Sequence, residues 1–349
     1  MISVLASLNA ALLRAFADDE RVLLLGEDVR DPYGGAFKVT RGLSSAYPDR
    51  VLNTPISEAG LVGVAAGMAL RGLRPVVEIM FGDFVTLIAD QIINHAAKFR
   101  WMYNDQARVP LLIRTPMGGR RGYGPTHSQT LEKLFLGVPG LRLLAPCHFG
   151  DPGALLYRAI LNSETPTLFV ENKLQYLLPV YTPVDSLEPV KELAEFELQE
   201  IWPAQDEVAA PLYRLRLKGA PPPSVTLAAY GYMAELARQA ILTLAYEHEI
   251  FAELIAPTQL SSSDAAPDAL QPLWESLRQT QRLLTIEEGT LPLGWGAEIA
   301  AHASEMARPL KWTRRVGAAS TPIPAAGPLE AATLPGVKQI VQAIQMMEI

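Results

Sequence analysis

The chain has 349 residues, of which 49% are hydrophobic and 19% are charged, with a formal net charge of -7. This length and apolar content predict about two folded domains. The acidic balance argues against nucleic acid as a partner, because phosphate binding depends on clustered Lys and Arg. A single cysteine excludes an internal disulfide framework, and the five histidines show no zinc-ligand spacing.

Membrane and export signals are absent from the sequence pattern. No apolar run reaches the roughly 18 residues needed to span a bilayer. The first residues lack the basic stretch and small-residue cleavage site of a signal peptide. We therefore expect a cytoplasmic protein with no membrane partner.

Short runs rich in Val, Ile and Leu alternate with helical periodicity in the first half, a pattern typical of a parallel sheet covered by helices. The runs predict strands over 22–25, 75–80, 109–114, 141–145 and 167–171. Two apolar stripes at helical spacing predict core helices, one with Ile2, Leu5, Leu8, Leu12 and Phe16, the other with Val85, Ile88, Ile92 and Phe99.

The composition changes between 182 and 223, where acidic residues and many prolines precede a new apolar strand. A smaller α/β unit follows, with strands predicted over 225–230, 250–255, 283–287 and 310–316 and a closing helix over 337–345. The sequence thus predicts an α/β protein of two doubly wound domains, 1–181 and 224–349, joined by a linker or insertion over 182–223.

One candidate site lies in the stretch from Asn53 to Gly60, which places the carboxylate of Glu58 at the end of an extended segment. A helix of small residues opens there, and small residues allow close approach by another structure. Glu58 has two interpretations: a helix-start residue that interacts with the helix dipole, or a buried carboxylate used for proton transfer.

A second candidate site is the loop from Gly118 to Gln129, rich in glycine and basic residues, which delivers His127 ahead of a helix. Glycine-rich loops bring the main chain close to ligands. The loop matches neither of the common nucleotide-binding patterns. His127 is therefore either a structural histidine or a functional one.

Further motifs accompany these two, including Gly26-Glu27-Asp28-Val29, Glu78-Ile79-Met80-Phe81, PTLFVENKLQY and LLTIEEG. With this ordered set, nearly the whole chain resembles the beta subunit of the decarboxylating, thiamine-diphosphate component of 2-oxo acid dehydrogenase complexes, of the pyruvate and branched-chain type. The fold implied is a transketolase-like pyrimidine-binding domain followed by a transketolase C-terminal-like domain.

The resemblance implies roles for single residues. Glu58 matches the glutamate that hydrogen-bonds the aminopyrimidine of thiamine diphosphate, where an apolar pocket favours proton sharing. His127 matches the histidine that assists acyl transfer to the lipoyl group. The further residues implied to contact the cofactor are Glu27, Ile56, Met80 and Phe84.

A structural potassium ion is also implied by the resemblance. Relatives hold it through main-chain oxygens, here at the positions of Leu111, Ala159, Ile160, Asn162 and Glu164. Backbone ligands leave little trace in a sequence, so this site depends on the family match alone.

The family motif GDG, which binds magnesium and the cofactor diphosphate, does not occur in these 349 residues. The resemblance implies that a separate alpha subunit supplies it, in an α2β2 heterotetramer with each cofactor between an alpha and a beta chain. The chain alone is then inactive. A lipoyl-bearing acyltransferase and a 2-oxo acid substrate are the other implied partners.

Two departures from the family pattern bear on those partners. The segment 182–223 is longer than the usual connection, and 318–324 lacks an acidic residue that relatives carry. Both put docking to a large complex in doubt. Alternative functions are a carboligase or acyl-transfer subunit of the transketolase type in a specialised pathway, and a non-catalytic paralogue that binds an active one.

Overall fold

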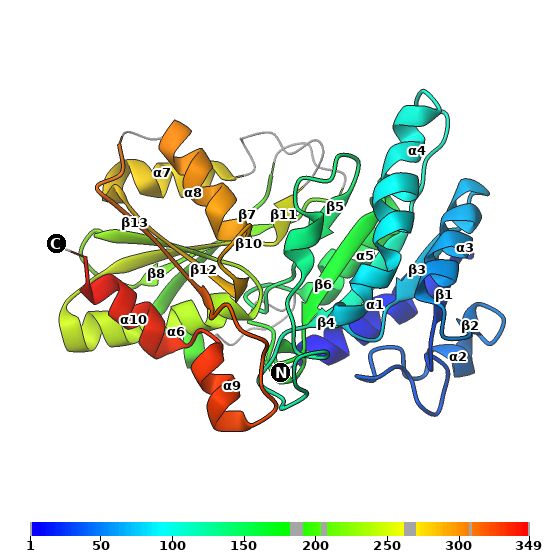
Figure 1. Cartoon of the computed structure of the whole chain (residues 1–349), viewed down its shortest axis with the longest axis horizontal. Coiled ribbons are helices and arrows are strands. Elements are labelled where there is room, and N and C mark those ends of the chain that lie inside the picture. Colours follow the sequence, from blue (N-terminus) through cyan, green and yellow to red (C-terminus); the bar gives the residue numbers. More distant parts are fainter. Residues whose placement is uncertain (1, 182–190, 204–207, 262–269, 307–308, 348–349) are drawn as a thin grey trace.

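The computed structural model describes residues 2–181, 191–203, 208–261, 270–306 and 309–347. Two α/β domains lie side by side, and the chain leaves the first for the second after β6 (Figure 1). The helices and strands of the first domain are α1 (Val4–Asp18), β1 (Val22–Gly26), α2 (Leu43–Ala46), β2 (Val51–Asn53), α3 (Glu58–Leu70), β3 (Arg74–Glu78), α4 (Ala97–Met102), β4 (Leu112–Met117), β5 (Arg142–Leu144), α5 (Pro152–Asn162) and β6 (Thr167–Asn172).

The first sheet has the strand order β11-β5-β6-β4-β3-β1-β2 and is parallel except at β11, where β11 (Gln259–Ser261) runs antiparallel to β5. Alternate residues of β1 enter two different cores. Val22 and Leu24 pack with α1 and α5, whereas Leu23 and Leu25 pack with α3 on the other face. Both faces are therefore buried, as the nearly continuous apolar strand sequences predict.

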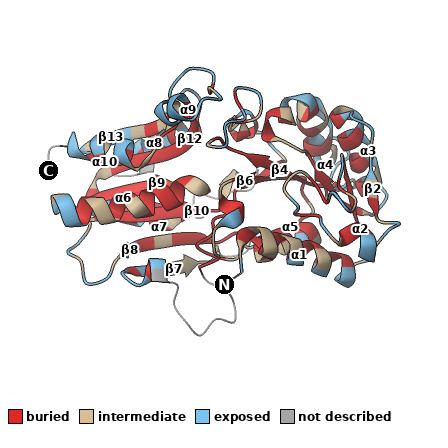
Figure 2. Ribbon diagram, turned by 90° about the horizontal axis from the view of Figure 1, so that it is seen from below, coloured by how far each residue is buried: buried red, intermediate tan, exposed pale blue. Residues whose placement is uncertain are grey.

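The second domain repeats this layering around the sheet β13-β12-β9-β10-β8-β7, with α6 and α10 on one face and α7 and α8 on the other. Buried residues line the space between helices and sheet in both domains (Figure 2). Its elements are β7 (Phe196–Ile201), β8 (Leu212–Leu217), β9 (Val225–Ala229), α6 (Tyr232–His248), β10 (Ala252–Pro257), α7 (Gln271–Thr280), β12 (Arg282–Thr290), α8 (Trp295–Met306), β13 (Trp312–Ala318), α9 (Gly327–Thr333) and α10 (Val337–Gln345).

The predicted fold class is confirmed, and each predicted strand overlaps an observed one. The structure differs over 182–223, which the sequence assigns to a linker: its described part contains β7 and β8, an antiparallel pair at the edge of the second sheet. Charged residues alternate with apolar ones in both strands, and Arg216 bonds Glu197 across the pair at 2.8 Å. This alternation is typical of edge strands. It gives β7 and β8 no continuous apolar run, so the sequence does not predict them as strands.

The two predicted helical stripes are only partly regular. Val85, Ile88 and Ile92 are buried as expected, but they lie on a 3-10 helix (Gly82–Ile88) and a π-helix (Gln91–Ala96) ahead of α4. In the first stripe, Ile2 is 40% exposed because α1 begins only after its N-cap, Ser3. Within the described residues, no helix is long and apolar enough to cross a membrane.

Helices α1 and α5 cross in close contact at Gly153. The Asp151 carboxylate caps α5 by accepting hydrogen bonds from the main-chain N–H groups of Gly153 and Ala154, at 2.9 and 3.1 Å. The Ser7 hydroxyl donates to the same carboxylate. A side chain at position 153 would place its Cβ 2.2 Å from the carbonyl oxygen of Ser7, so glycine is required there by space.

We therefore expect Gly153→Ala to separate α1 from α5 and to lower the free energy of unfolding by about 1–3 kcal/mol. Chemical denaturation of the full chain measures this. Gly67→Ala is the matched control, because a Cβ there meets no atom within 4 Å and alanine raises helix propensity by up to about 1 kcal/mol. If both variants unfold with the same free energy, the contact between α1 and α5 can accommodate a Cβ atom and the prediction is wrong.

Candidate active site

The candidate residues follow the carboxyl ends of four adjacent strands of the first sheet, in the order β4-β3-β1-β2. Because carboxyl ends of parallel strands share one edge of a sheet, these residues gather there. They are Glu27 after β1, Ile56 and Glu58 after β2, Met80 and Phe84 after β3, and His127 in the loop after β4.

Glu27 and Glu58 form a pair of carboxyls at this edge. Glu58 is the first residue of α3 and is only 9% exposed. Burial raises the pKa of Glu27, and the negative charge of Glu58 raises it further, against a hydrogen bond from the Ser57 main chain. The Glu27 Oε1 atom is buried and has no hydrogen-bond partner among the described residues. The two carboxyls are therefore suited to share a proton with a polar ligand bound at this edge of the sheet.

His127 lies in an aromatic group with Phe81, Phe84 and Tyr123. Its ring meets Phe81 and Phe84 edge to face, with centroid distances of 4.7 and 5.5 Å. Its Nδ1 atom lies 3.0 Å from the Thr126 hydroxyl. The structure thus places His127 against Phe84 and adds Phe81, whose ring contacts both.

Lys173 is a site residue that the sequence interpretation missed. It is fully buried, and its Nζ donates to the main-chain oxygen of His127 at 2.5 Å. The ammonium also lies over the rings of Phe81 and Tyr123, at 5.3 and 5.6 Å from their centroids. Burial lowers its pKa to about 8, while Asp83 and Glu288 oppose this change. The only sequence signal is a lysine directly after an apolar strand.

A buried ion cluster supports the strand edge from beneath. Arg114 on β4 donates to Glu171 on β6 at 2.8 and 2.5 Å and also to Glu78 on β3. The Tyr176 hydroxyl donates to Glu171 at 2.5 Å. Arg114 is 1% exposed, so both carboxylates are needed to offset its desolvation.

Two predicted cofactor contacts are less enclosed. Ile56 is 84% exposed, so its side chain contributes an apolar surface and little packing in this chain. Met80 is partly buried, directly before Phe81. The implied cofactor contacts of Ile56 and Met80 therefore remain predictions.

Two of the main-chain oxygens implied to bind potassium, those of Ile160 and Leu111, already accept hydrogen bonds from the protein. The Arg74 guanidinium donates to the carbonyl oxygens of Ile160 and Ser163 at 3.1 and 3.0 Å and to the Glu164 carboxylate at 2.5 Å. The Leu111 carbonyl accepts from the Thr167 N–H. A potassium ion at Ile160 would compete with the Arg74 guanidinium for the same carbonyl oxygen, so potassium is left out of the proposed function.

Across the described ranges, no group of three or more His, Cys, Asp or Glu is arranged to hold a metal ion. The implied magnesium thus has no acidic ligand cluster in this part of the chain.

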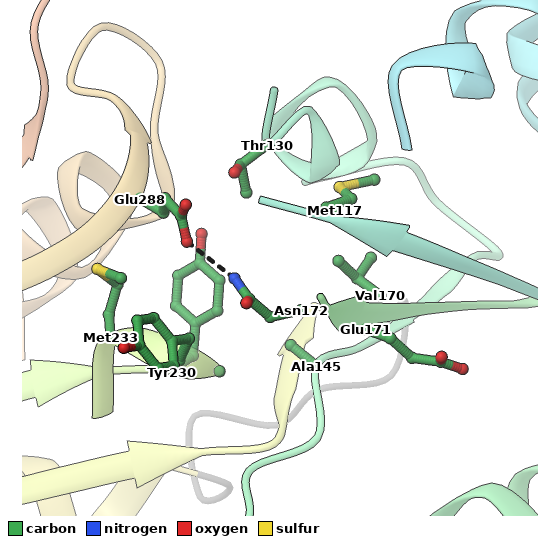
Figure 3. Close-up of a pocket in the computed structure, with 11 residues that line it drawn as sticks. Met117, Thr130, Ala145, Val170, Glu171, Asn172, Tyr230, Met233 and Glu288 are labelled. Carbon is green, nitrogen blue, oxygen red and sulfur yellow. Dashed lines mark hydrogen bonds between the residues drawn. The ribbon is translucent and has the colours of Figure 1, made fainter. Parts of the chain in front are cut away.

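A pocket between the domains borders the histidine loop (Figure 3). In it, Asn172 of the first domain donates to Glu288 of the second at 2.8 Å, and Tyr230 also lines the pocket. The Tyr230 hydroxyl donates to the buried Glu132.

Glu287, 1% exposed, accepts from the Gly296 N–H at 3.2 Å. Burial raises the pKa of Glu287 to about 7, and the charge of Glu132 adds to this.

This geometry agrees with the family to which both domains belong. Residues 1–178 match the transketolase pyrimidine-binding domain and residues 218–340 match the transketolase C-terminal domain. The chain belongs to the transketolase-like family that contains the E1 beta subunits of 2-oxo acid dehydrogenases. The family resemblance given by the sequence motifs is therefore confirmed.

Particular relatives narrow the comparison. A mitochondrial pyruvate dehydrogenase E1 component subunit beta-1 of Oryza sativa is 36% identical, over 98% of this chain and 85% of the relative. The acetoin:2,6-dichlorophenolindophenol oxidoreductase subunit beta of Bacillus subtilis is 34% identical, over 98% and 95%. A solved structure titled as an inactive beta4 tetramer of a split-gene transketolase has a TM-score of 0.71 at 20% identity, over 99% and 97%, which shows the shared fold.

The Glu287 carboxyl gives a prediction for stability against pH. Because its pKa is raised in the fold, it stabilises the protein fully below the unfolded value near 4.5, and this contribution is lost as pH rises through about 7. Glu287→Gln should remove that loss and exceed the wild type in stability above pH 7, by on the order of 1–3 kcal/mol. Urea unfolding from pH 5 to 8.5 measures it, with the exposed Glu298→Gln as control. Parallel curves for wild type and Glu287→Gln would contradict the assignment.

Proposed function

We propose that this chain is the beta subunit of a thiamine-diphosphate-dependent 2-oxo acid dehydrogenase, active only when an alpha subunit completes the site. The reaction is oxidative decarboxylation of a 2-oxo acid with acyl transfer to lipoamide. The observation that carries the proposal is the Glu27 and Glu58 carboxyl pair, placed at the sheet edge of a pyrimidine-binding domain beside an aromatic group that includes His127.

The residues present fit an aminopyrimidine. The buried, unpartnered Glu27 Oε1 calls for a donor, and the flat faces of Phe81 and Phe84 suit a heterocycle. Glu58 would exchange a proton with the ring nitrogen, and Glu27, whose pKa is raised, would remain protonated more readily beside it. When bound, thiamine diphosphate supplies the electron sink that decarboxylation needs.

His127 has the second chemical role. An imidazole can donate and accept protons near neutral pH, as transfer of an acyl group to a thiol requires. Its backbone is fixed by Lys173 and its ring by Phe81 and Phe84, so the ring has a defined orientation before any substrate binds. We assign to His127 the acyl-transfer step.

An exposed apolar face on α3 supports the need for a second subunit. Gly60, Gly63, Val64, Gly67 and Leu70 recur at helical spacing and are all exposed, Val64 by 56% and Leu70 by 41%. Ile56 continues the face toward Glu58. Small and apolar residues in a continuous stripe permit close helix packing, and water is a poor neighbour for them. We assign this face to the alpha subunit, which would also bring the diphosphate and magnesium ligands.

The choice of substrate stays within two chemical classes. The names of relatives include both pyruvate dehydrogenase and acetoin oxidoreductase subunits, so a 2-oxo acid and a 2-hydroxy ketone are the two classes to compare. The dye 2,6-dichlorophenolindophenol can accept the electrons from either substrate, so one assay with a 2-oxo acid and one with a 2-hydroxy ketone compare the two classes. A third assay, with an aldehyde acceptor in place of the dye, tests the carboligase alternative. If the chain and its alpha subunit are inactive in all three assays, the chain is a non-catalytic paralogue.

In the reconstituted enzyme, Glu58→Gln should lower kcat by about 100-fold or more, because an amide cannot exchange a proton with the ring nitrogen. Circular dichroism should show an unchanged fold. The matched control is Glu20→Gln, an exposed carboxyl at the far end of β1. Turnover within twofold of the wild type would remove Glu58 from catalysis and, with it, the proposed reaction.

Introducing a charge on the apolar face tests the partner. Val64→Glu should leave the isolated chain folded, because the side chain is exposed, yet weaken alpha-subunit binding at least tenfold by burying an unpaired carboxylate. Size-exclusion chromatography with light scattering on mixtures of the two subunits measures assembly. Leu177→Glu, 77% exposed on a different surface, is the control. Normal assembly by Val64→Glu would place the partner elsewhere.

A further inference from the structure

The loop that carries His127 has an unusual main-chain conformation. Every second residue from 118 to 124 has positive φ: Gly118 at 94°, Arg120 at 65°, Gly122 at 69° and Gly124 at 75°. Such alternation turns successive N–H groups toward one side, which makes a concave site for an anion. Arg120 adopts this conformation without being glycine, so something must hold it there.

The anion is provided by the second domain. Glu330 on α9 is 4% exposed and accepts from the Arg120 N–H at 2.8 Å and from the Gly122 N–H at 3.1 Å. Each carboxylate oxygen thus takes one main-chain donor of the loop. Glutamate is rarely buried unless its carboxylate is paired, and these two hydrogen bonds supply the pairing.

A second carboxylate grips the start of the same loop. Glu288 on β12 accepts from the Gly119 N–H at 2.8 Å and from the Arg120 guanidinium at 2.9 Å, while its other oxygen accepts from Asn172. The Arg120 guanidinium also donates to the Pro335 carbonyl. Five donors of three loop residues, Gly119, Arg120 and Gly122, are therefore bound by Glu288, Glu330 and Pro335 of the second domain.

We propose that Glu288 and Glu330 form a carboxylate clamp that positions the His127 loop, making the second domain responsible for the orientation of His127. They act as positioning residues. The path is short: Gly122 lies five residues before His127, whose N–H donates to the Gly124 carbonyl at 3.4 Å and whose carbonyl is held by Lys173. The clamp fixes one end of this stretch and Lys173 the other. The inference rests on the proposed function of His127.

The first test reads the loop directly and needs no catalysis. Arg121 is exposed at the centre of the clamped segment, so trypsin can cut after it only when the loop opens. Glu330→Gln should speed this cleavage in the full chain about tenfold, the loss expected for one charge-assisted hydrogen bond. Mass spectrometry identifies the cut. Glu197→Gln, which removes an exposed carboxylate of the same domain, should leave the rate unchanged.

The second test reads catalysis in the reconstituted enzyme. Glu330→Gln should lower kcat for acyl transfer to a lipoyl domain about tenfold, in the direction of His127→Ala, with KM for the 2-oxo acid and dye-linked decarboxylation near wild type. A role limited to stability would lower all of these together with the active fraction. Glu288→Gln should repeat the pattern, and it replaces Glu330→Gln if that variant does not fold.

The two tests separate the clamp from the proposed function. An unchanged cleavage rate in both variants overturns the clamp, whatever the enzyme does. Faster cleavage at Arg121 together with a selective loss of acyl transfer supports it. Faster cleavage in an assembly that never uses a 2-oxo acid supports the clamp and refutes only the proposed reaction.

Discussion

The buried ion cluster around Arg114 is the constraint on which the site depends. Its guanidinium joins β3, β4 and β6 through Glu78 at the end of β3 and Glu171 next to the end of β6, while Arg114 itself lies within β4. A buried charge without partners is costly, so the three strand ends cannot shift apart without exposing one. The segments that leave these strands carry Phe81, the histidine loop and Lys173. The ion cluster therefore fixes where these segments leave the sheet, and the contacts of each segment fix its position beyond that point.

The same logic joins the two domains. Strand β11 belongs to the second half of the chain but pairs with β5 in the first sheet, and the Ala145 N–H donates to the Thr258 carbonyl at 2.8 Å nearby. Beside this junction, main-chain donors of the glycine-rich loop meet carboxylates of the second domain. Interfaces between domains are usually polar and permit motion. Here the contacts are charged, buried and directed at one loop, so the second domain helps to determine the conformation of a loop of the first domain.

The sequence predicts the parts of this structure that depend on local pattern. Apolar runs located the parallel strands because those strands are buried on both faces. The family motifs indicated Glu58, Phe84 and His127, which follow adjacent strands of the first sheet, with Phe84 beside His127. Strands β7 and β8 escaped because their edge position makes them polar on one face. Lys173 and Glu330 escaped for a different reason: each acts on a main-chain atom far away in sequence, at 46 and 210 residues, and main-chain partners leave no pattern in side chains.

Arg74 lies against part of the site where the family resemblance implies a potassium ion. Of the residues implied to bind potassium, Ala159, Ile160 and Asn162 lie in the last turn of α5, and the end of a helix is electronegative. The positive charge at this helix end comes from Arg74 on β3, whose guanidinium donates to Ile160, Ser163 and Glu164. A tethered cation is always present, whereas an ion must be captured at its prevailing concentration. The end of α5 is thereby stabilised by a charge that belongs to the chain itself.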